Sequence, residues 1–293
     1  MLLIFALLFC VYAGDNWAIL VAGSNTYGNF RHQADVCQDY QQLKEAGIPE
    51  ERIIVWMYDD IANNPQNPHK GSIINYIGGP NVYPGVPHDY TGKDVIPGNF
   101  LKLLRGEDMT GIGSGKTLKS TENDNVFIYF TDHGGPGIIC FPGFIELHVA
   151  DLISALTTMT TKKMYNQLTF YLEACESGSM FDGKLTDDMN IYAVTASNPT
   201  ESSWACDYSS DYEAYLNDCW SRDFINDTRW AINNQAMSTR TMEEQYNWVK
   251  QQSTKSPECR YGKMDFTDET LDYFQGQRSS KKMKKFPAGM KTH

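Results

Sequence analysis

The stretch FYLEACESGSMF, residues 170–181, carries the strongest structural signal in this chain. An apolar run typical of a buried strand stops at Cys175, which stands between Glu173 and Glu176. The small residues SGS follow at once, as they do in a tight turn. The pattern therefore predicts a strand that delivers a thiol, flanked by two carboxylates, to the edge of a sheet.

Other apolar runs share the character of this strand. They are near-continuous rather than alternating, which indicates strands whose two faces are both covered. The predicted strands are residues 17–23, 52–58, 125–131, 167–174 and 190–196. Helical patterns lie between them, at residues 33–47, near 99–104, at 147–159 and at 241–252. This alternation predicts an α/β fold with a mostly parallel central sheet flanked by helices.

A long segment, residues 63–119, is rich in Gly, Pro and Asn and carries little regular structure of its own. Long loops of this kind are often functional. A plain surface insertion explains the composition equally well, and both readings stay open.

Composition and charge exclude several classes of protein. The chain has 293 residues and a net charge of −11, which argues against a nucleic-acid binder. We expect a signal peptide at residues 1–14, with a first core strand as the alternative reading, one catalytic domain at 15–276 and a short basic tail at 277–293. We expect no cofactor and no stable insertion into a membrane.

Six cysteines remain after the predicted signal peptide, and none forms a CxxC pair, so we expect no metal site. The six allow three disulfides, but a free nucleophile would leave at least one more cysteine unpaired. The one glycosylation sequon begins at Asn226.

The carboxyl ends of parallel strands meet at one edge of a sheet, and sites form there. His133 follows the strand at 125–131, and Cys175 follows the strand at 167–174. Neighbouring strand ends would bring a thiol and an imidazole together, as nucleophilic catalysis requires. Gly134 and Gly135 would let backbone N–H groups approach a developing oxyanion. A lone cysteine is more often a buried structural residue, but the pair DHGG and EACESGS is far more specific.

These residues carry a resemblance to a known family. VAGSN, NFRHQAD, GIPEERIIVWMYDDIA, GVPHDYTGKDV, IYFTDHGGPG and YLEACESGSM together resemble the legumain, or asparaginyl endopeptidase, family of cysteine proteases. The resemblance runs from about Asn16 to about Gly276. It implies a three-layer, caspase-like α/β fold, with a mostly parallel central sheet of about six strands flanked by helices. It also implies a signal-bearing glycoprotein of the secretory pathway, in a lysosome or vacuole or secreted.

The resemblance implies roles for individual residues. Cys175 would be the nucleophile, His133 the general base and acid, and Asn29 the residue that orients His133. The backbone N–H groups of Cys175 and Gly134 would form the oxyanion hole. Asp132 matches an aspartate that can cyclise to a succinimide. The residues implied to bind the substrate side chain are Arg31, His32, Glu173, Ser203 and Asp218.

An asparagine side chain explains why carboxylates would surround the thiol. Its NH₂ needs acceptors, which Glu173 and Asp218 offer, and its C=O needs a donor, which Arg31 offers. A plain buried ion pair between Arg31 and Glu173 is the alternative. Glu176 fits a backbone-capping role slightly better than a direct catalytic one.

Two departures from the family pattern stand out. Residues 277–293 are too short for a helical C-terminal prodomain, so we expect either no need for one or a separate protein inhibitor. Cys219, directly after Asp218, is unexpected and is a candidate partner for Cys206.

The expected function is hydrolysis of peptide bonds after Asn, and after Asp at acid pH, with transpeptidation as a further capacity. The alternatives are the catalytic subunit of a GPI-anchor transamidase and a catalytically inactive secreted binding protein of the same fold.

Overall fold

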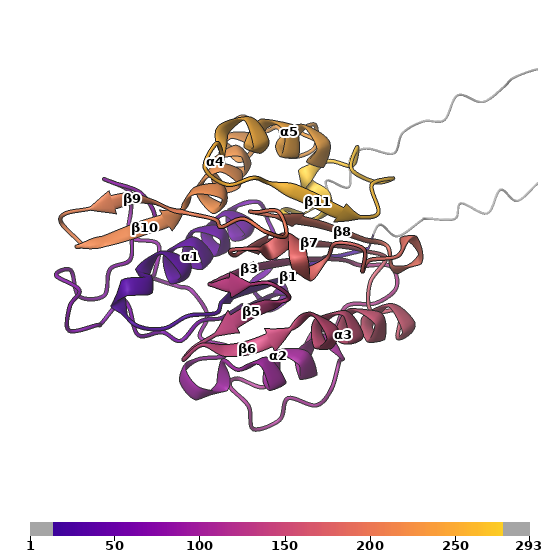
Figure 1. Ribbon diagram of the computed structural model, residues 1–293, viewed down its shortest axis with the longest axis horizontal. Coiled ribbons are helices and arrows are strands. Elements are labelled where there is room, and N and C mark those ends of the chain that lie inside the picture. Colours follow the sequence, from indigo (N-terminus) through magenta and orange to yellow (C-terminus); the bar gives the residue numbers. More distant parts are fainter. Residues whose placement is uncertain (1–13, 278–293) are drawn as a thin grey trace, which may run out of the picture.

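A six-stranded sheet forms the centre of the molecule, in the order β11-β8-β7-β3-β1-β2 (Figure 1). All neighbouring pairs run parallel except β11 with β8 at the edge. The strands are β1 (Asn16–Ala22), β2 (Ile53–Trp56), β3 (Asn125–Thr131), β7 (Gln167–Glu173), β8 (Ile191–Thr195) and β11 (Cys259–Gly262). The sheet belongs to a computed structural model that describes residues 14–277. The predicted signal peptide and basic tail lie outside these residues, apart from Gly14 and Gln277.

Helices cover both faces of this sheet, which makes three layers (Figure 1). Alternate residues of β1 show why: Ala18 and Leu20 pack into one apolar core, while Ile19 and Val21 pack into the other. The first face is covered by α1 (Phe30–Glu45), α4 (Cys219–Asn233) and α5 (Met242–Gln252), and the second by α2 (Pro97–Leu104) and α3 (Val149–Thr161). The predicted three-layer, mostly parallel fold is confirmed.

The start of α1 differs from the prediction. We expected the helix from Gln33, but it begins at Phe30, directly after a 3-10 turn at Tyr27–Asn29. The ring of Phe30 packs edge-on against Tyr27 and Tyr212, which fixes the helix start against the rest of the fold. The earlier start places residues 31 and 32 in the first helical turn.

Several elements were not predicted. The helix α4 is one of them, because its buried side includes polar residues such as Ser221, Asp223 and Thr228, which hide its apolar period. The predicted helix at 147–159 is correct only from Val149, since its first two residues belong to a strand. The unpredicted strands, besides β11, are β4 (Gly134–Gly135), β5 (Ile138–Phe141), β6 (Ile145–His148), β9 (Ala205–Ser209) and β10 (Ala214–Asp218). They form a three-stranded sheet, β4-β5-β6, and a hairpin, β9-β10.

The long segment 63–119 is held against the body by a few specific contacts. Trp56 of β2 stacks on Tyr90, with ring centroids 3.8 Å apart. The ammonium group of Lys116 donates to the carbonyl oxygens of Glu50 and Ile53 and lies 3.3 Å from Asp89 Oδ2. Across residues 14–277, no helix has the length and apolar content needed to cross a bilayer.

Candidate active site

The site begins where β3 and β7 end side by side. Thr131 and Glu173 are register partners, and the N–H of Asp132 donates to the carbonyl of Glu173 at 3.1 Å. His133 and Cys175 each follow two residues beyond that register pair. Gly134 lies so close that a Cβ there would meet the carbonyl oxygen of Cys175 at 2.5 Å. The structure thus brings the predicted histidine and cysteine segments together, and only glycine fits between them.

The imidazole of His133 is oriented by Asn29, which lies immediately before α1. The Nε2 of His133 is 2.9 Å from Asn29 Oδ1, while the Nδ2 of Asn29 donates to the carbonyl of Asn25 at 2.9 Å. An amide oxygen only accepts, so Nε2 carries the ring hydrogen and Nδ1 carries the lone pair. Burial, with a smaller contribution from Arg31, lowers the pKa of His133. The ring is therefore a neutral base with a fixed tautomer.

The thiol of Cys175 is half-buried, and its Sγ lies 3.7 Å from the carbonyl oxygen of Ser203. The turn that follows is tight: Glu176 adopts a left-handed conformation, with φ 49°, and its N–H donates to the carbonyl of Glu201 at 2.8 Å. A non-glycine residue in this region is uncommon and is held by its surroundings. The turn keeps the thiol beside the chain segment that contains Ser203.

Gly134 was predicted to supply one oxyanion donor, and the strand pairing beside it shows how its N–H is placed in the ladder. The N–H of Cys140 donates to the carbonyl of His133 at 3.0 Å, and Gly134 pairs with Ile139 across the β4-β5 ladder. This register makes Gly134 a non-hydrogen-bonded position, so the ladder does not use its N–H. The Gly134 backbone also lies against the Cys175 peptide, and the oxyanion role of its N–H stays a prediction.

A cluster of charged side chains, called the slot below, lies at the end of β3, where Asp218 Oδ2 accepts from the hydroxyl of Thr131 at 3.4 Å. The Nε of Arg31 donates to Asp218 Oδ1 at 2.8 Å, and their side chains are only 13% and 5% exposed. The bond uses Nε–H and leaves the two terminal amino groups of the guanidinium for another acceptor. Asp218 ends β10, so a helix and a hairpin meet in this pair.

Glu173 faces the same region but does not pair with Arg31. Its Oε2 accepts from the N–H and the hydroxyl of Ser221, at 3.1 and 3.0 Å. Within residues 14–277 no ion pair joins Arg31 to Glu173, so that alternative is wrong. Burial, reinforced by the charge of Asp218 and opposed by the hydroxyls of Ser203 and Ser221, raises the pKa of Glu173. Glu173 therefore stays protonated to a higher pH than an ordinary glutamic acid.

Asp35 and Ser221 support this slot, and the sequence analysis missed both. Asp35 Oδ2 accepts the N–H of Asp218 at 3.1 Å, and its Oδ1 accepts from Asn75 at 2.6 Å. Asp35 lies one helical turn after Arg31, a spacing that could have flagged it. Nothing in the sequence around Ser221 indicates its contact with Glu173.

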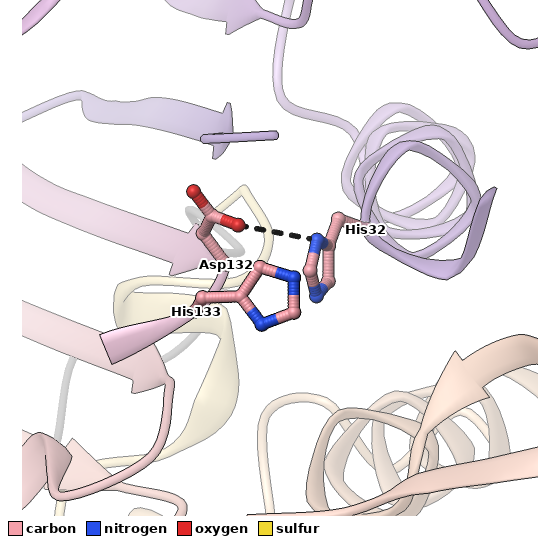
Figure 2. Close-up of side chains that lie close together, drawn as sticks. All are labelled: His32, Asp132 and His133. Carbon is pink, nitrogen blue, oxygen red and sulfur yellow. Dashed lines mark ion pairs between the residues drawn. The ribbon is translucent and has the colours of Figure 1, made fainter. Parts of the chain in front are cut away.

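His32 is fully buried behind the slot, between two carboxylates. Its Nδ1 lies 2.7 Å from Ser24 Oγ and 3.4 Å from Asp132 Oδ1, and its Nε2 lies 3.4 Å from Asp218 Oδ2. Figure 2 shows the His32 and His133 rings side by side, with Asp132 beyond them. Burial lowers the pKa of His32 far below its usual value, so the ring is neutral. Burial raises the pKa of Asp132 to about 8.

The other side of His133 contacts an exposed aromatic ring. Phe144 lies between β5 and β6, is 70% exposed and stacks on His133, with centroids 5.7 Å apart. Both residues line a small pocket that also includes Asn25, Asn29 and Gly143. Sequence reasoning missed Phe144, because an isolated aromatic in a turn has no period to reveal it.

Two other predictions concern the rim of the site. Cys206 and Cys219 form a disulfide, as the sequence suggested. The disulfide joins β9 to the start of α4. It therefore links the strand that follows Ser203 to the residue that follows Asp218. Among the described residues, Cys37, Cys140, Cys175 and Cys259 are unpaired. Asn226 is exposed on α4, and its glycosylation stays a prediction.

Comparisons with known proteins agree with the fold and with the family resemblance. The model of the "Peptidase C13 family" matches residues 16–277. The chain is similar to legumain of Rattus norvegicus and legumain of Homo sapiens, each at 47% identity over 267 residues. It is also 47% identical over 255 residues to a vacuolar-processing enzyme of Vicia sativa, of which it covers 51%.

The aligned share of each protein and a match to a solved structure complete the comparison. Each legumain alignment covers 90% of this chain, which spans 60% of the length of those relatives. A crystal structure of caspase-1 from Spodoptera frugiperda matches with a TM-score of 0.50 at 12% identity, covering 91% of this chain and 92% of that one. That similarity concerns the fold alone, and it agrees with the caspase-like layering predicted from the sequence.

Proposed function

This chain belongs to the peptidase C13 family, and from that premise we propose that it is a cysteine endopeptidase that cleaves after asparagine. The observation that carries the proposal is the register of β3 and β7, which delivers His133 and Cys175 to adjacent strand ends. The pairing of His133 with Asn29 gives the imidazole the tautomer that such a reaction needs.

The reaction starts when His133 Nδ1 takes the thiol proton of Cys175. The sulfur attacks the carbonyl carbon of the scissile bond, and the N–H groups of Gly134 and Cys175 stabilise the oxyanion. The C–N bond breaks as the imidazolium returns its proton to the leaving amine. Water then attacks the thioester, His133 takes one proton from it, and the thiol and a carboxylic acid are released.

The slot suits a carboxamide. The guanidinium of Arg31, fixed by Asp218, donates to the substrate oxygen, while Asp218 and Glu173 accept from the NH₂ group. Ser203 and His32 complete the wall. A glutamine side chain is one methylene longer and would misplace the scissile bond. The slot therefore discriminates Asn from Gln by its depth as well as by its polar groups.

Acid should widen the specificity to aspartate. The raised pKa of Glu173 leaves Asp218 as the main negative charge that a substrate carboxylate meets. Protonation of the substrate Asp, with an ordinary pKa of about 3.9, gives a neutral group that the slot accepts. If an amine replaces water at the thioester, the same intermediate gives transpeptidation. Cyclisation of Asp132 stays a prediction.

The partners that follow from the reaction are protein or peptide substrates with Asn at the cleavage site. A thiol protease that keeps the Cys206–Cys219 disulfide fits the secretory pathway and its acidic end-compartments. Neither alternative function is favoured by a specific observation. An inactive binding protein would not need a free thiol beside an oriented neutral imidazole.

Peptides that end in Asn or in Gln before a reporter amine test the proposal. Wild-type chain should turn over the Asn peptide at least about 100-fold faster, and Cys175→Ala should abolish the turnover. Equal turnover of both peptides, or activity that survives Cys175→Ala, would refute the proposal.

A further inference from the structure

Three potential metal ligands converge beside the proposed catalytic pair. The ligand atoms of His32, Asp132 and His133 all lie within 4.8 Å of one another, and Figure 2 shows them facing a common space. His32 comes from the first turn of α1, whereas Asp132 and His133 follow the end of β3. His32 lies about a hundred positions before Asp132 and His133 in the sequence, so no local motif indicates the cluster, and no metal site was expected from the sequence.

The carboxylate of Asp132 is the strongest sign of a missing ligand. Asp132 is 4% exposed, and neither of its side-chain oxygens has a hydrogen-bond partner among the described residues. Buried carboxylate oxygens are almost always satisfied by a donor, a water or an ion. The nearest polar atom of the cluster is His32 Nδ1, at 3.4 Å from Oδ1.

Both imidazoles are held from outside the cluster in the way that metal-binding histidines are. His32 Nε2 faces Asp218 Oδ2 at 3.4 Å, and His133 Nε2 lies 2.9 Å from Asn29 Oδ1. A hydrogen on each Nε2 leaves the Nδ1 lone pairs for a ligand, with Ser24 Oγ as the present donor to His32. Outer partners of this kind fix the tautomer and orientation of a ligating histidine.

The donor set selects the class of ion. Two neutral imidazoles and one carboxylate suit Zn²⁺ and neighbouring transition metals, whereas Ca²⁺ and Mg²⁺ prefer oxygen ligands alone. Ligands at about 2.0–2.2 Å from a tetrahedral ion lie roughly 3.4 Å from one another. The His32–Asp132 edge already has this length. Movement of His133, the most exposed of the three, closes the remaining distance.

The geometry points to a binding site for one Zn²⁺-class ion formed by His32, Asp132 and His133. Such an ion would inhibit the proposed peptidase reversibly. A neutral imidazole has one lone pair and one hydrogen, so a metal on either nitrogen leaves His133 unable to take the thiol proton. The inhibition rests on the proposed function, but the binding does not.

Calorimetric titration of Zn²⁺ into the full chain carrying Cys175→Ala tests the site without a contribution from the thiolate. We expect one ion per chain, and more than about tenfold weaker binding when Asp132→Asn or His32→Asn is added. The matched control is His69→Asn, which removes an exposed histidine 2.8 Å from Asp211 and should leave the affinity unchanged. No binding to the Cys175→Ala chain, or binding that Asp132→Asn leaves intact, overturns the proposal.

A spectroscopic measurement on the unmutated chain covers the case in which a variant fails to fold. Bound Co²⁺ should show visible bands of nitrogen and oxygen ligation, without an intense near-ultraviolet charge-transfer band from a thiolate. A strong thiolate band would assign the ion to Cys175 instead. Both measurements are made without substrate, so their failure leaves the peptidase proposal standing, and an inactive peptidase leaves the metal site standing.

Discussion

His133 Nε2 lies 2.9 Å from Asn29 Oδ1, and this contact links the end of β3 to the start of α1. Because Asn29 can only accept through that oxygen, the contact determines which ring nitrogen is free to act as a base. The first prediction tests this dependence directly.

Asn29→Ala should lower kcat about tenfold or more with little change in KM, because the ring loses its orientation but the substrate slot is untouched. Asn29→Asp keeps an acceptor and should recover much of the rate. Its negative charge stabilises the imidazolium, so the acidic limb of the kcat/KM profile should move to higher pH. Asn123→Ala, in an exposed loop, is the control. Identical pH profiles for wild type and Asn29→Asp would contradict the assigned role.

Arg31→Lys should lower kcat/KM for Asn peptides by more than about tenfold, mainly through KM. Lysine keeps the charge but cannot donate to Asp218 and to a substrate oxygen from one rigid plane. Steady-state kinetics with Asn peptides measure the change, and circular dichroism checks the fold. A variant with unaltered KM would show that Arg31 does not contact the substrate.

Glu173→Gln should retain turnover within about threefold, because the raised pKa of Glu173 means that its neutral form already dominates in acid. Glu173→Ala removes the acceptor of two Ser221 bonds and should both destabilise the chain and reduce activity. The comparison is made by thermal unfolding and by kcat/KM. Equal losses in the Gln and Ala variants would indicate that Glu173 works as a charged carboxylate.

Two buried carboxylic acids should make the chain less stable as the pH rises above neutral. Burial raises the pKa of Asp39 and of Glu258 to about 8, so each binds its proton more tightly when folded. Their contribution is complete below about pH 4 and is lost as the pH rises through about 8. Above about pH 6.5, where His32 is neutral both folded and unfolded, the Tm should therefore fall as the pH rises. Glu258→Gln, which keeps the 2.8 Å acceptor for Trp220 Nε1, should make the fall shallower. A Tm that rises with pH over this range would disprove the assignment.

Replacing both Cys206 and Cys219 by Ser should lower the free energy of unfolding by about 3 kcal/mol, the value for a loop of this size. It should also raise KM for Asn peptides, since the disulfide joins β9, which follows Ser203, to the residue after Asp218. The control is Cys259→Ser, which removes a half-buried unpaired thiol. If KM stays constant while stability drops, the disulfide supports the fold but not the slot.

The central strands were predictable because they are buried on both faces, and continuous apolar runs such as residues 125–131 have no other common explanation. His133 and Cys175 could be placed together because parallel strands end at one edge. The contacts that surround these two residues could not be predicted from the sequence. Ser221 meets Glu173 only because α4 crosses that edge, and its sequence lacks a clean apolar face. Phe144 meets His133 only because an unpredicted hairpin folds back over the site.

Asn29, Arg31 and His32 lie within four consecutive positions at and just before the start of α1. The residue proposed to orient the base and the residues proposed to recognise the substrate are therefore held by the same helical turn. A mutation that changes which substrate side chain is accepted by shifting this helical turn would also misalign the imidazole of His133. The other residues proposed to contact the substrate, Ser203 and Asp218, flank the β9-β10 hairpin, which the Cys206–Cys219 disulfide joins to α4. That hairpin is where an engineer could alter selectivity and leave the reaction chemistry intact.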